Sequence, residues 1–444
     1  MKKSIFLILP AVMLMLASCM DSAGRNGGAG SVRVVLPGSS RDVSDSDRAD
    51  SYTVSLLKGG KVIESQTAVP GGAVEFNELD AGSYTVDVEA TLSGALSGVG
   101  SAEVAVTEGE TASCTVLMNR VYTADAAVEY IESLKAGSYK VIVAGAIDDG
   151  GIEGIKTALN ENNINKPLVS LDLGRTTGLS SIGAAKFQNC TALSAIVLPE
   201  GIGSIKESAF EECTSLASVT IPDTVNEIGQ SAFRDCSALK SIEIPNSVTT
   251  IASGVFRECT ALTSIEIPRG VITIGSDSFN GCMALKSIDI PDSVTTIERA
   301  AFHGCSSLTD VYIPDSVTEI GNQTFTNCSN LKSIVLSAGI TSIAEQVFRN
   351  CTSLTSIEIP DGVSEIKSSA FMSCEVLESI TIPASLTSIG ASAFHLCNKL
   401  KGGTVKYKGL SDDWSGIAID SNNPPFESDS GIKIICSDNK TITL

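Results

Sequence analysis

A 23-residue repeat constrains this chain more than any other feature. Residues 263–285 read TSIEIPRGVITIGSDSFNGCMAL, and the next copy reads KSIDIPDSVTTIERAAFHGCSSL. Ten cysteines stand 23 residues apart, from Cys190 to Cys397. A phenylalanine stands three residues before each of them and a leucine three residues after. A fixed period of this length indicates a solenoid, in which each repeat stacks on its neighbours.

Each repeat predicts one coil of the solenoid. The shared pattern is L-x-x-I-x-I-P-x-x-V-x-x-I-x-x-x-A-F-x-x-C. Its first six residues predict a strand, because the two isoleucines lie two apart and share one face. Proline ends that strand, since it has no N–H to donate. V-x-x-I predicts a second short extended piece, and the residues around A-F predict a helical turn with the phenylalanine and cysteine inside.

The repeat pattern resembles the BspA-like class of leucine-rich repeats, which is found in bacterial surface proteins. The resemblance covers about residues 168–400. It implies a β-rich α/β solenoid, a leucine-rich-repeat superhelix of 23-residue coils, over residues 165–403. The first copy departs from the pattern, because Asn165 replaces the cysteine and lies 25 residues before Cys190, which suits an edge coil. The tail VKYKGLSDDWSGIAI resembles the segment that often closes such arrays, so we expect a C-terminal cap over residues 404–444 in which Trp414 covers the last coil.

Two modules are predicted before the repeats. Residues 31–120 contain about seven short apolar runs separated by turn residues such as Gly59-Gly60, a pattern typical of a β-sandwich. Within them, FNELDAGSYTVDVEA resembles the closing hairpin of prealbumin-like modules, so we expect a prealbumin-like or Ig-like spacer. Residues 121–164 predict a helix, a strand and a second helix, with Thr123 or Asp125 as the first N-cap. We expect this α/β unit to cap the open end of the solenoid.

The N-terminus predicts export. Lys2 and Lys3 precede the apolar run SIFLILPAVMLMLA, which is too short to span a bilayer as a helix and indicates a signal peptide over residues 1–18. The ending L-A-S-C resembles a bacterial lipobox, which implies a diacylglycerol on the thiol of Cys19 and a flexible tether over residues 19–30. The protein would then be lipid-anchored to the bacterial outer membrane or cell surface. The alternative is ordinary secretion with Cys19 incidental.

Charge and histidine content argue against nucleic-acid binding and catalysis. Acidic residues outnumber basic ones by 51 to 31, and a surface of that sign repels phosphate backbones. The two histidines, His303 and His395, occupy the same turn of different coils, so no Ser-His-Asp or Cys-His arrangement follows from them. We expect both on the surface, and we expect no enzyme activity, cofactor or metal.

The cysteine ladder has three interpretations. Paired strands lie about 4.8 Å apart, a distance that a disulfide can bridge, and an exported chain tolerates disulfides. The strict spacing of one per coil favours instead small buried thiols that pack beside phenylalanine and stay reduced. Scattered disulfides and metal binding are the alternatives. Cys114 and Cys436 are expected in the cores of their own modules.

The predicted binding face is the outward strand position, seven residues after each cysteine. This position varies while its inward neighbours barely change, as a recognition surface allows. The candidate residues are Thr220, Glu243, Glu266, Asp289, Tyr312, Val335 and Glu358. The three consecutive acids are either a solvated acidic strip or calcium ligands.

These features lead to one functional hypothesis and one alternative. The resembling family is implicated in adherence to host matrix proteins and to other bacteria. We therefore expect an adhesin-like, non-catalytic monomer that binds an extracellular protein or glycan and contacts the membrane only through its lipid. The alternative is a cell-envelope scaffold or glycan-capture protein without a host ligand.

Overall fold

The chain is described by a computed structural model for residues 30–36, 49–70, 72–92, 95–107, 110–113, 119–161 and 167–444. It divides into two units, which are treated separately: residues 1–127 with 141–144, and residues 128–140 with 145–444. The predicted signal peptide, residues 19–29 of the predicted tether, Cys114 and Asn165 lie outside the described residues, and Gly30 already belongs to the first strand. The predicted boundaries of the modules stay predictions.

The first unit is built from short strands in two sheets. The strands are β1 (Gly30–Val35), β2 (Ser51–Lys58), β3 (Lys61–Ala68), β4 (Ala73–Leu79), β5 (Gly82–Leu92), β6 (Ala95–Val106), β7 (Thr111–Ser113) and β8 (Asn119–Tyr122). One sheet has the order β4-β1-β7, and β3, β2, β5, β6 and β8 are successive antiparallel neighbours in the other. Alternate residues of β2 are buried, and Tyr52 and Val54 share a core with Val32 and Phe76 of the first sheet. The predicted antiparallel β-module is confirmed.

Two helices and one strand follow: α1 (Ala124–Ser133), β9 (Gly137–Ala146) and α2 (Asp149–Glu161). Thr123 is the N-cap of α1, because the N–H of Ala126 donates to its Oγ1 at 3.4 Å. In α2 the buried face is Ile152, Ile155, Ala158 and Leu159. Lys156 on this helix donates from Nζ to the carbonyl oxygen of Ala185 at 2.9 Å, so α2 contacts the first coil of the solenoid.

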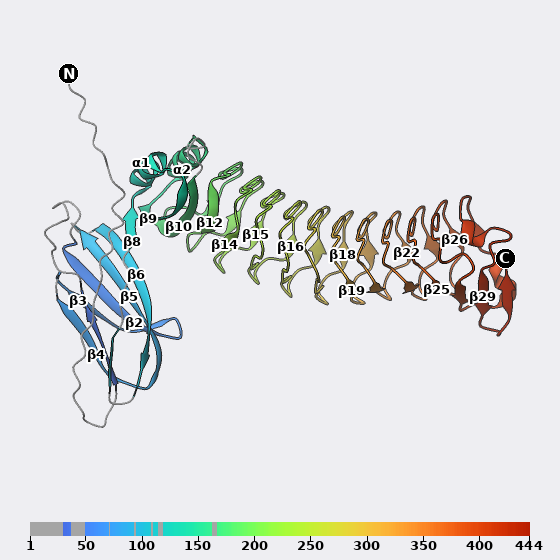
Figure 1. Cartoon of the computed structure of the whole chain (residues 1–444), viewed down its shortest axis with the longest axis horizontal. Helices are drawn as coiled ribbons and strands as arrows, with labels where there is room; N and C mark the ends of the chain where they lie inside the picture. Colours follow the sequence, from blue (N-terminus) through green and yellow to red (C-terminus); the bar gives the residue numbers. More distant parts are fainter. Residues whose placement is uncertain are drawn as a thin grey trace, which may run out of the picture. The chain divides into compact units, whose positions relative to one another are not determined.

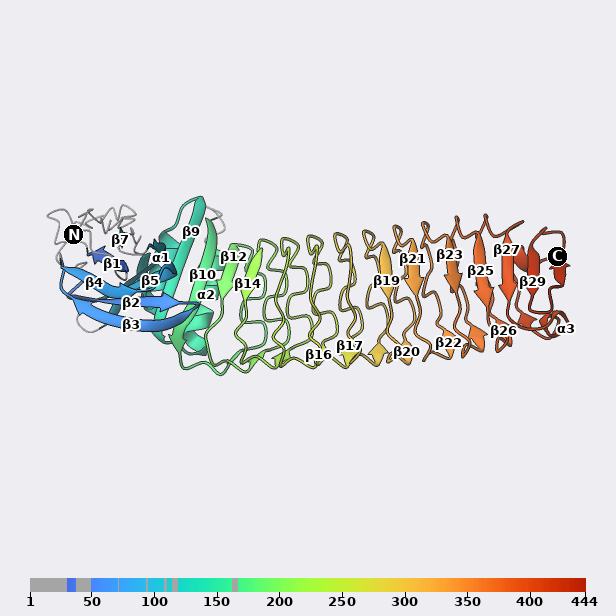
Figure 2. The ribbon, with the colours of Figure 1, turned by 90° about the horizontal axis from the view of Figure 1, so that it is seen from below.

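The second unit is a stack of 23-residue coils that pair in two parallel rows of strands (Figures 1 and 2). The first ladder, from L-x-x-I-x-I, contains β10 (Pro167–Thr177), β12 (Leu193–Val197), β14 (Ser218–Thr220), β19 (Asp310–Tyr312), β21 (Ser333–Val335), β23 (Ser356–Glu358), β25 (Ser379–Ile382), β27 (Thr404–Tyr407) and β29 (Lys433–Cys436). The second ladder, from V-x-x-I, contains β11 (Ser181–Ile182), β13 (Ser204–Ile205), β15 (Glu227–Ile228), β16 (Thr250–Ile251), β17 (Thr273–Ile274), β18 (Thr296–Ile297), β20 (Glu319–Ile320), β22 (Ser342–Ile343), β24 (Glu365–Ile366), β26 (Ser388–Ile389) and β28 (Ala418–Ile419). Equivalent residues pair, as Ile182 does with Ile205, and the predicted solenoid is confirmed.

Both ladders are interrupted. Between β14 and β19 the first ladder forms no strand, only an isolated bridge between Glu266 and Asp289, and it breaks again between β21 and β23. The second ladder breaks between β15 and β16 and again between β20 and β22. The prediction of a regular strand in every copy of L-x-x-I-x-I is therefore wrong for the middle coils, although their inward isoleucines remain buried.

The predicted helical turn before each cysteine is also wrong. In the first coil Ala185 and Asn189, five residues and one residue before the cysteine, have φ of 55° and 64°. The same two positions have positive φ in the later coils, where glycine occupies some of them. Residues with left-handed backbone angles cannot continue an α-helix. In this turn, the N–H group of every second residue points instead at the next coil. Ala185, Phe187 and Asn189 donate to the carbonyl oxygens of Glu207, Ala209 and Glu211 at 3.0, 2.8 and 2.8 Å.

A column of ten stacked phenylalanines runs through the core of the solenoid. From Phe187 to Phe394, neighbouring ring centroids lie 5.2 to 5.9 Å apart with interplanar angles of 1° to 20°. No ring in the column is more than 1 % exposed. Each ring is therefore desolvated by the coil before it and the coil after it.

The C-terminal segment closes this column. It contains α3 (Ser411–Trp414), the 3₁₀ helix η3 (Pro424–Phe426) and β30 (Thr441–Thr443), which pairs antiparallel with β29. Phe426 meets Phe394 edge-on, with centroids 5.2 Å apart at 74°. Trp414 lies behind it, 5.9 Å from Phe426 and 5.3 Å from Tyr407. The aromatic cover of the last ring is therefore Phe426, and Trp414 supports it.

Removing one ring from the middle of the column should destabilise the array. Phe279 stacks 5.6 Å from Phe256 and 5.3 Å from Phe302. We expect Phe279→Ala to lower the free energy of unfolding by about 3–5 kcal/mol, because the rigid neighbouring coils leave a cavity. Urea denaturation measures the change, and Met283→Ala, at a side chain 52 % exposed in the next turn, is the control. A loss below about 1 kcal/mol for Phe279→Ala would show that the column does not carry the stability.

Candidate binding face

All seven predicted binding residues are exposed on the solvent side of the first ladder. Their shared feature is the position seven residues after a cysteine, and the exposed row is Thr220, Glu243, Glu266, Asp289, Tyr312, Val335 and Glu358. The residue on each side of this position is buried, as Val311 and Ile313 are beside Tyr312, except that Ile221 beside Thr220 is partly exposed. The alternation of strand side chains therefore places the row as predicted, even where no regular strand forms.

Three of the acids make up the acidic part of the row. Glu243, Glu266 and Asp289 lie on consecutive coils and form no ion pair among the described residues. In the part of the chain that the structure describes, no three His, Cys, Asp or Glu side chains are grouped to hold a metal ion. These three carboxylates give this stretch a negative local field.

The apolar part of the row consists of two neighbouring side chains. Tyr312 at the end of β19 pairs in register with Val335 at the end of β21, and each is 57 % exposed. Two residues earlier on the same strands, Ser333 donates to Asp310, and this hydrogen bond lowers the pKa of the Asp310 carboxyl. The row thus presents an apolar pair beside a carboxylate that is held in its charged form.

Glu358 differs from the other acids of the row because it is already paired. Lys408 lies 2.9 Å from its Oε1 and 2.8 Å from Oδ1 of Asp361. Hydrogen bonds to Asp361 and Glu358 raise the pKa of the Lys408 ammonium. Sequence reasoning missed this contact, because Lys408 follows the repeats and no periodic signal connects it to Glu358. The free part of the predicted face therefore ends at Val335.

The cysteines form a ladder of thiols inside the coils. Ten ladder cysteines are free and buried. From Cys213 onward, each Sγ donates to the carbonyl oxygen of the phenylalanine in the preceding coil, at 2.9 Å for Cys213 to Phe187 and 3.2 Å for Cys282 to Phe256. Burial raises the pKa of the Cys190, Cys328 and Cys397 thiols to about 12. The ladder is a packing element of neutral thiols, as the spacing predicted.

The two histidines are half-buried rather than fully exposed. His303 lies in a polar row between neighbouring coils, with Nδ1 3.3 Å from Oδ1 of Asn280 and Nε2 3.4 Å from Nδ2 of Asn327. Desolvation lowers the pKa of His303. Nδ1 of His395 is buried and has no hydrogen-bond partner. The histidines lie four coils apart, and neither is paired with a nucleophile.

Stacked 23-residue coils with parallel ladders on two sides define the class of protein, a leucine-rich-repeat solenoid. The family described as "BspA type Leucine rich repeat region (6 copies)" matches residues 180–306 and 272–401. The two matches together span residues 180–401, half of the 444 residues. The chain belongs to the BspA-type leucine-rich-repeat proteins.

Several solved bacterial structures are similar to this chain. A leucine-rich cell surface protein from Faecalibacterium prausnitzii is 29% identical, with 65% of this chain and 86% of that chain covered and a TM-score of 0.35. A leucine-rich-repeat protein from Bacteroides ovatus is 26% identical, with 58% and 88% covered and a TM-score of 0.37. A search of curated proteins found no match. At these TM-scores, the family match is the observation that assigns the chain.

None of the helices among the described residues is both long enough and apolar enough to span a membrane.

The buried thiols predict a pH-dependent stability. An unfolded thiol ionises near pH 8.5, whereas the folded Cys328 thiol ionises at about 12. The folded state therefore keeps a proton that the unfolded state loses, and the stabilisation present below about pH 8.5 declines between about pH 8.5 and 12. Serine does not ionise in this pH range. Above about pH 8.5 we therefore expect the free energy of unfolding of Cys328→Ser to fall less steeply with pH than that of the wild type, by about 1.4 kcal/mol per pH unit. Denaturation series from pH 7 to 11 measure this difference.

The same thiols predict a labelling pattern. In the native protein at pH 8 the ladder cysteines should be protected from a thiol reagent, and in denaturant without reductant all ten should react. A denatured protein with few reactive ladder thiols would show that disulfides explain the spacing.

Proposed function

We propose that this protein is a non-catalytic, lipid-anchored bacterial surface protein that binds an extracellular protein or glycan through the exposed row of the first ladder. Three observations support the proposal: the membership of a BspA-type family, the L-A-S-C sequence before Cys19, and an exposed row that varies over an invariant core. The row has no catalytic role here, because its side chains are carboxylates, hydroxyls and apolar groups without a paired base.

The observation that carries the proposal is the Tyr312 and Val335 pair. Both are large apolar side chains, both are 57 % exposed, and the register of β19 and β21 sets them side by side. Other positions of the row are hydroxyls and acids. A tyrosine held on a rigid strand loses little conformational freedom when a partner covers it, which is why aromatic residues dominate binding energy at interfaces.

The unpaired acids beside the apolar pair would set the rate of association. Glu243, Glu266 and Asp289 precede Tyr312 on the three neighbouring coils. Their field extends over roughly 10 Å at 0.1 M salt and attracts a partner with a basic surface. The row thus combines an apolar contact surface with a negative field that speeds association. The partner that fits it is a protein or glycan surface with positive charge next to an apolar patch.

The lipid anchor can be tested directly. Cys19→Ala removes the thiol that would take the diacylglycerol, so we expect loss of metabolic palmitate labelling and release of the protein from membranes. Ser18→Ala, beside the same site, keeps the thiol and serves as the control. Retention of Cys19→Ala in the membrane fraction would contradict the lipobox interpretation.

The binding face can be tested with residues 31–444 screened against extracellular matrix proteins and polysaccharides. For a ligand that binds, we expect Tyr312→Ala combined with Val335→Ser to weaken the affinity about thirtyfold. This factor corresponds to a loss of about 2 kcal/mol of binding free energy, which is typical of a residue that dominates an interface. Reversing charge with Glu243→Lys and Glu266→Lys should change mainly the on-rate and its salt dependence.

Matched substitutions on other faces separate a local effect from a general one. Ile272→Ser removes an apolar side chain that is 47 % exposed beside the second ladder, and His303→Ala alters the turn before the cysteine. Both should leave affinity unchanged. Equal loss from these controls would locate the site elsewhere, and binding by residues 31–120 alone would make the solenoid the spacer.

A further inference from the structure

The second ladder opens between two coils near its middle. In the coil before, Thr318 donates its N–H to Thr295 at 2.9 Å and Gly321 donates to Ile297 at 2.7 Å. In the coil after, Ser364 donates to Thr341 at 3.0 Å and Lys367 to Ile343 at 2.9 Å. Among the described residues, the corresponding bonds from Thr341 and Ala344 to Thr318 and Ile320 are not formed. Two N–H groups and two carbonyl oxygens are left without their ladder partners.

The opening is confined to this side of the solenoid. The same two coils are paired in the first ladder, where Tyr312 meets Val335. They are also joined at the turn, where Phe325 donates its N–H to Val347 at 2.9 Å. Their phenylalanine rings are 5.9 Å apart, the widest spacing in the column. The gap is therefore a fixed feature between two coils that are held together elsewhere.

The coil that opens the gap departs from the repeat pattern. Ser337 stands where the other coils have proline, and it is fully buried. Its Oγ donates to the carbonyl oxygen of Val317 and accepts from the N–H of Gly339 at 2.9 Å. In a regular coil a serine two positions later makes that contact, as Ser293 does with Val271 at 2.7 Å. The loop that leads into β22 is thus held by the hydroxyl of Ser337, in place of the serine two positions later that holds the loop of a regular coil.

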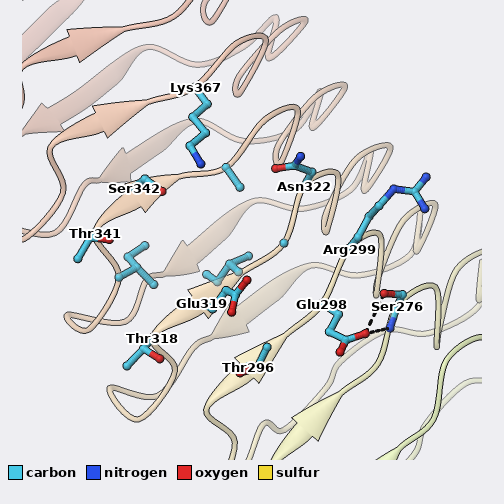
Figure 3. Close-up of a pocket in the computed structure, with 14 residues that line it drawn as sticks. Ser276, Thr296, Glu298, Arg299, Thr318, Glu319, Asn322, Thr341, Ser342 and Lys367 are labelled. Atoms are coloured by element: carbon cyan, nitrogen blue, oxygen red, sulfur yellow. Dashed lines mark hydrogen bonds between the residues drawn. The ribbon is translucent and has the colours of Figure 1, made fainter.

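A pocket of about 550 Å³ lies over the opening (Figure 3). Its lining includes Gly321 and Ala344, and Glu298 and Lys367 occupy the same repeat position one coil further out on either side. These two small residues therefore lie between the repeat positions of Glu298 and Lys367, which are three coils, or about 14 Å, apart along the stack. The lining of this pocket, called the trough below, therefore carries side chains of opposite charge on coils three steps apart.

The walls of the trough offer hydrogen bonds in both directions. Hydroxyls come from Thr296, Thr318, Thr341 and Ser342, and an amide from Asn322. Thr318 Oγ1 already donates to the carbonyl oxygen of Thr295, and Oδ1 of Asn322 already accepts from the N–H of Glu345, so these two groups have their remaining lone pairs or N–H groups to offer. Oε2 of Glu298 accepts from the N–H and the Oγ of Ser276 at 2.9 and 2.8 Å, which fixes that carboxylate (Figure 3). Lys367 and Glu319 have no ion-pair partner among the described residues, and Lys367 points toward the middle of the pocket (Figure 3).

This lining selects one class of ligand. A phosphate-rich ligand is disfavoured, because Glu298 and Glu319 face it and Lys367 is the one cation of the lining without an ion-pair partner in the described residues. An extended peptide is disfavoured as well, because β20 and β22 are two residues long and offer too few ladder pairs. We propose that the trough binds a short oligosaccharide, whose hydroxyls both donate and accept and so satisfy the wall hydroxyls, Glu319, Lys367 and the unpaired backbone groups.

The experiment uses two pairs of matched variants. Ser342→Leu fills the trough, and Ser388→Leu makes the same change at the same repeat position where β26 is paired. Lys367→Ala removes the free ammonium, and Lys206→Ala removes an equivalent lysine that is paired with Glu227 at 2.7 Å. The probes are maltohexaose, xylohexaose, chitohexaose and hexagalacturonate, measured by calorimetry against residues 31–444. Thermal unfolding confirms that each variant is folded.

We expect at least one probe to bind, with affinity reduced at least tenfold by Ser342→Leu and Lys367→Ala and changed less than twofold by the controls. Amide hydrogen exchange at Thr341 and Ala344 should slow when the probe is bound, because the ligand covers their unpaired N–H groups. No binding to any probe, or binding that is insensitive to both trough variants, overturns the inference. The double substitution at Tyr312 and Val335 should leave this binding unchanged. The experiments therefore test the trough proposal and the proposal for the first-ladder face independently of each other.

Discussion

Burial of one coil by the next is the interaction on which the structure depends. From Phe210 to Phe394, each phenylalanine of the column has an aromatic ring on both sides of it, and each thiol from Cys213 onward finds its acceptor in the preceding coil. A single coil has no interior of its own. The requirement explains why phenylalanine and cysteine recur without exception, since every coil meets the same environment and only one combination of sizes fills it.

The same constraint explains how far the sequence could be interpreted. The period, the buried residues and the exposed row follow from patterns that repeat, and they agree with the structure. The turn before each cysteine did not follow, because its left-handed residues are stabilised by hydrogen bonds to the next coil, as between Ala185 and Glu207. The gap at Thr341 and the ion pair of Glu358 with Lys408 were also missed. The ion pair joins the repeats to a segment that follows them, which no periodic pattern records. For the gap, the sequence offers one local sign, Ser337 in place of proline, but this does not show that the hydrogen bonds of the second ladder are lost.

The invariant interior leaves the surface free to vary. Because the packing of each coil is fixed by its inward residues, a change such as Thr to Tyr in the exposed row costs the core nothing. The first ladder thereby places Tyr312 and Val335 beside three acids, and the second ladder places hydroxyls around a gap in its own hydrogen bonds. Two surfaces of different chemistry are thus built from one repeated coil, each at a different position of the repeat.

The nearest-neighbour packing also determines how the solenoid responds to tension. A coil at the end of the stack contacts one neighbour and can detach without disturbing the others, which then become the new end. Each detachment releases 23 residues, roughly 80 Å of extended chain. A solenoid pulled at its two ends therefore lengthens in equal steps, and each step dissipates work while the remaining coils keep their binding surfaces intact.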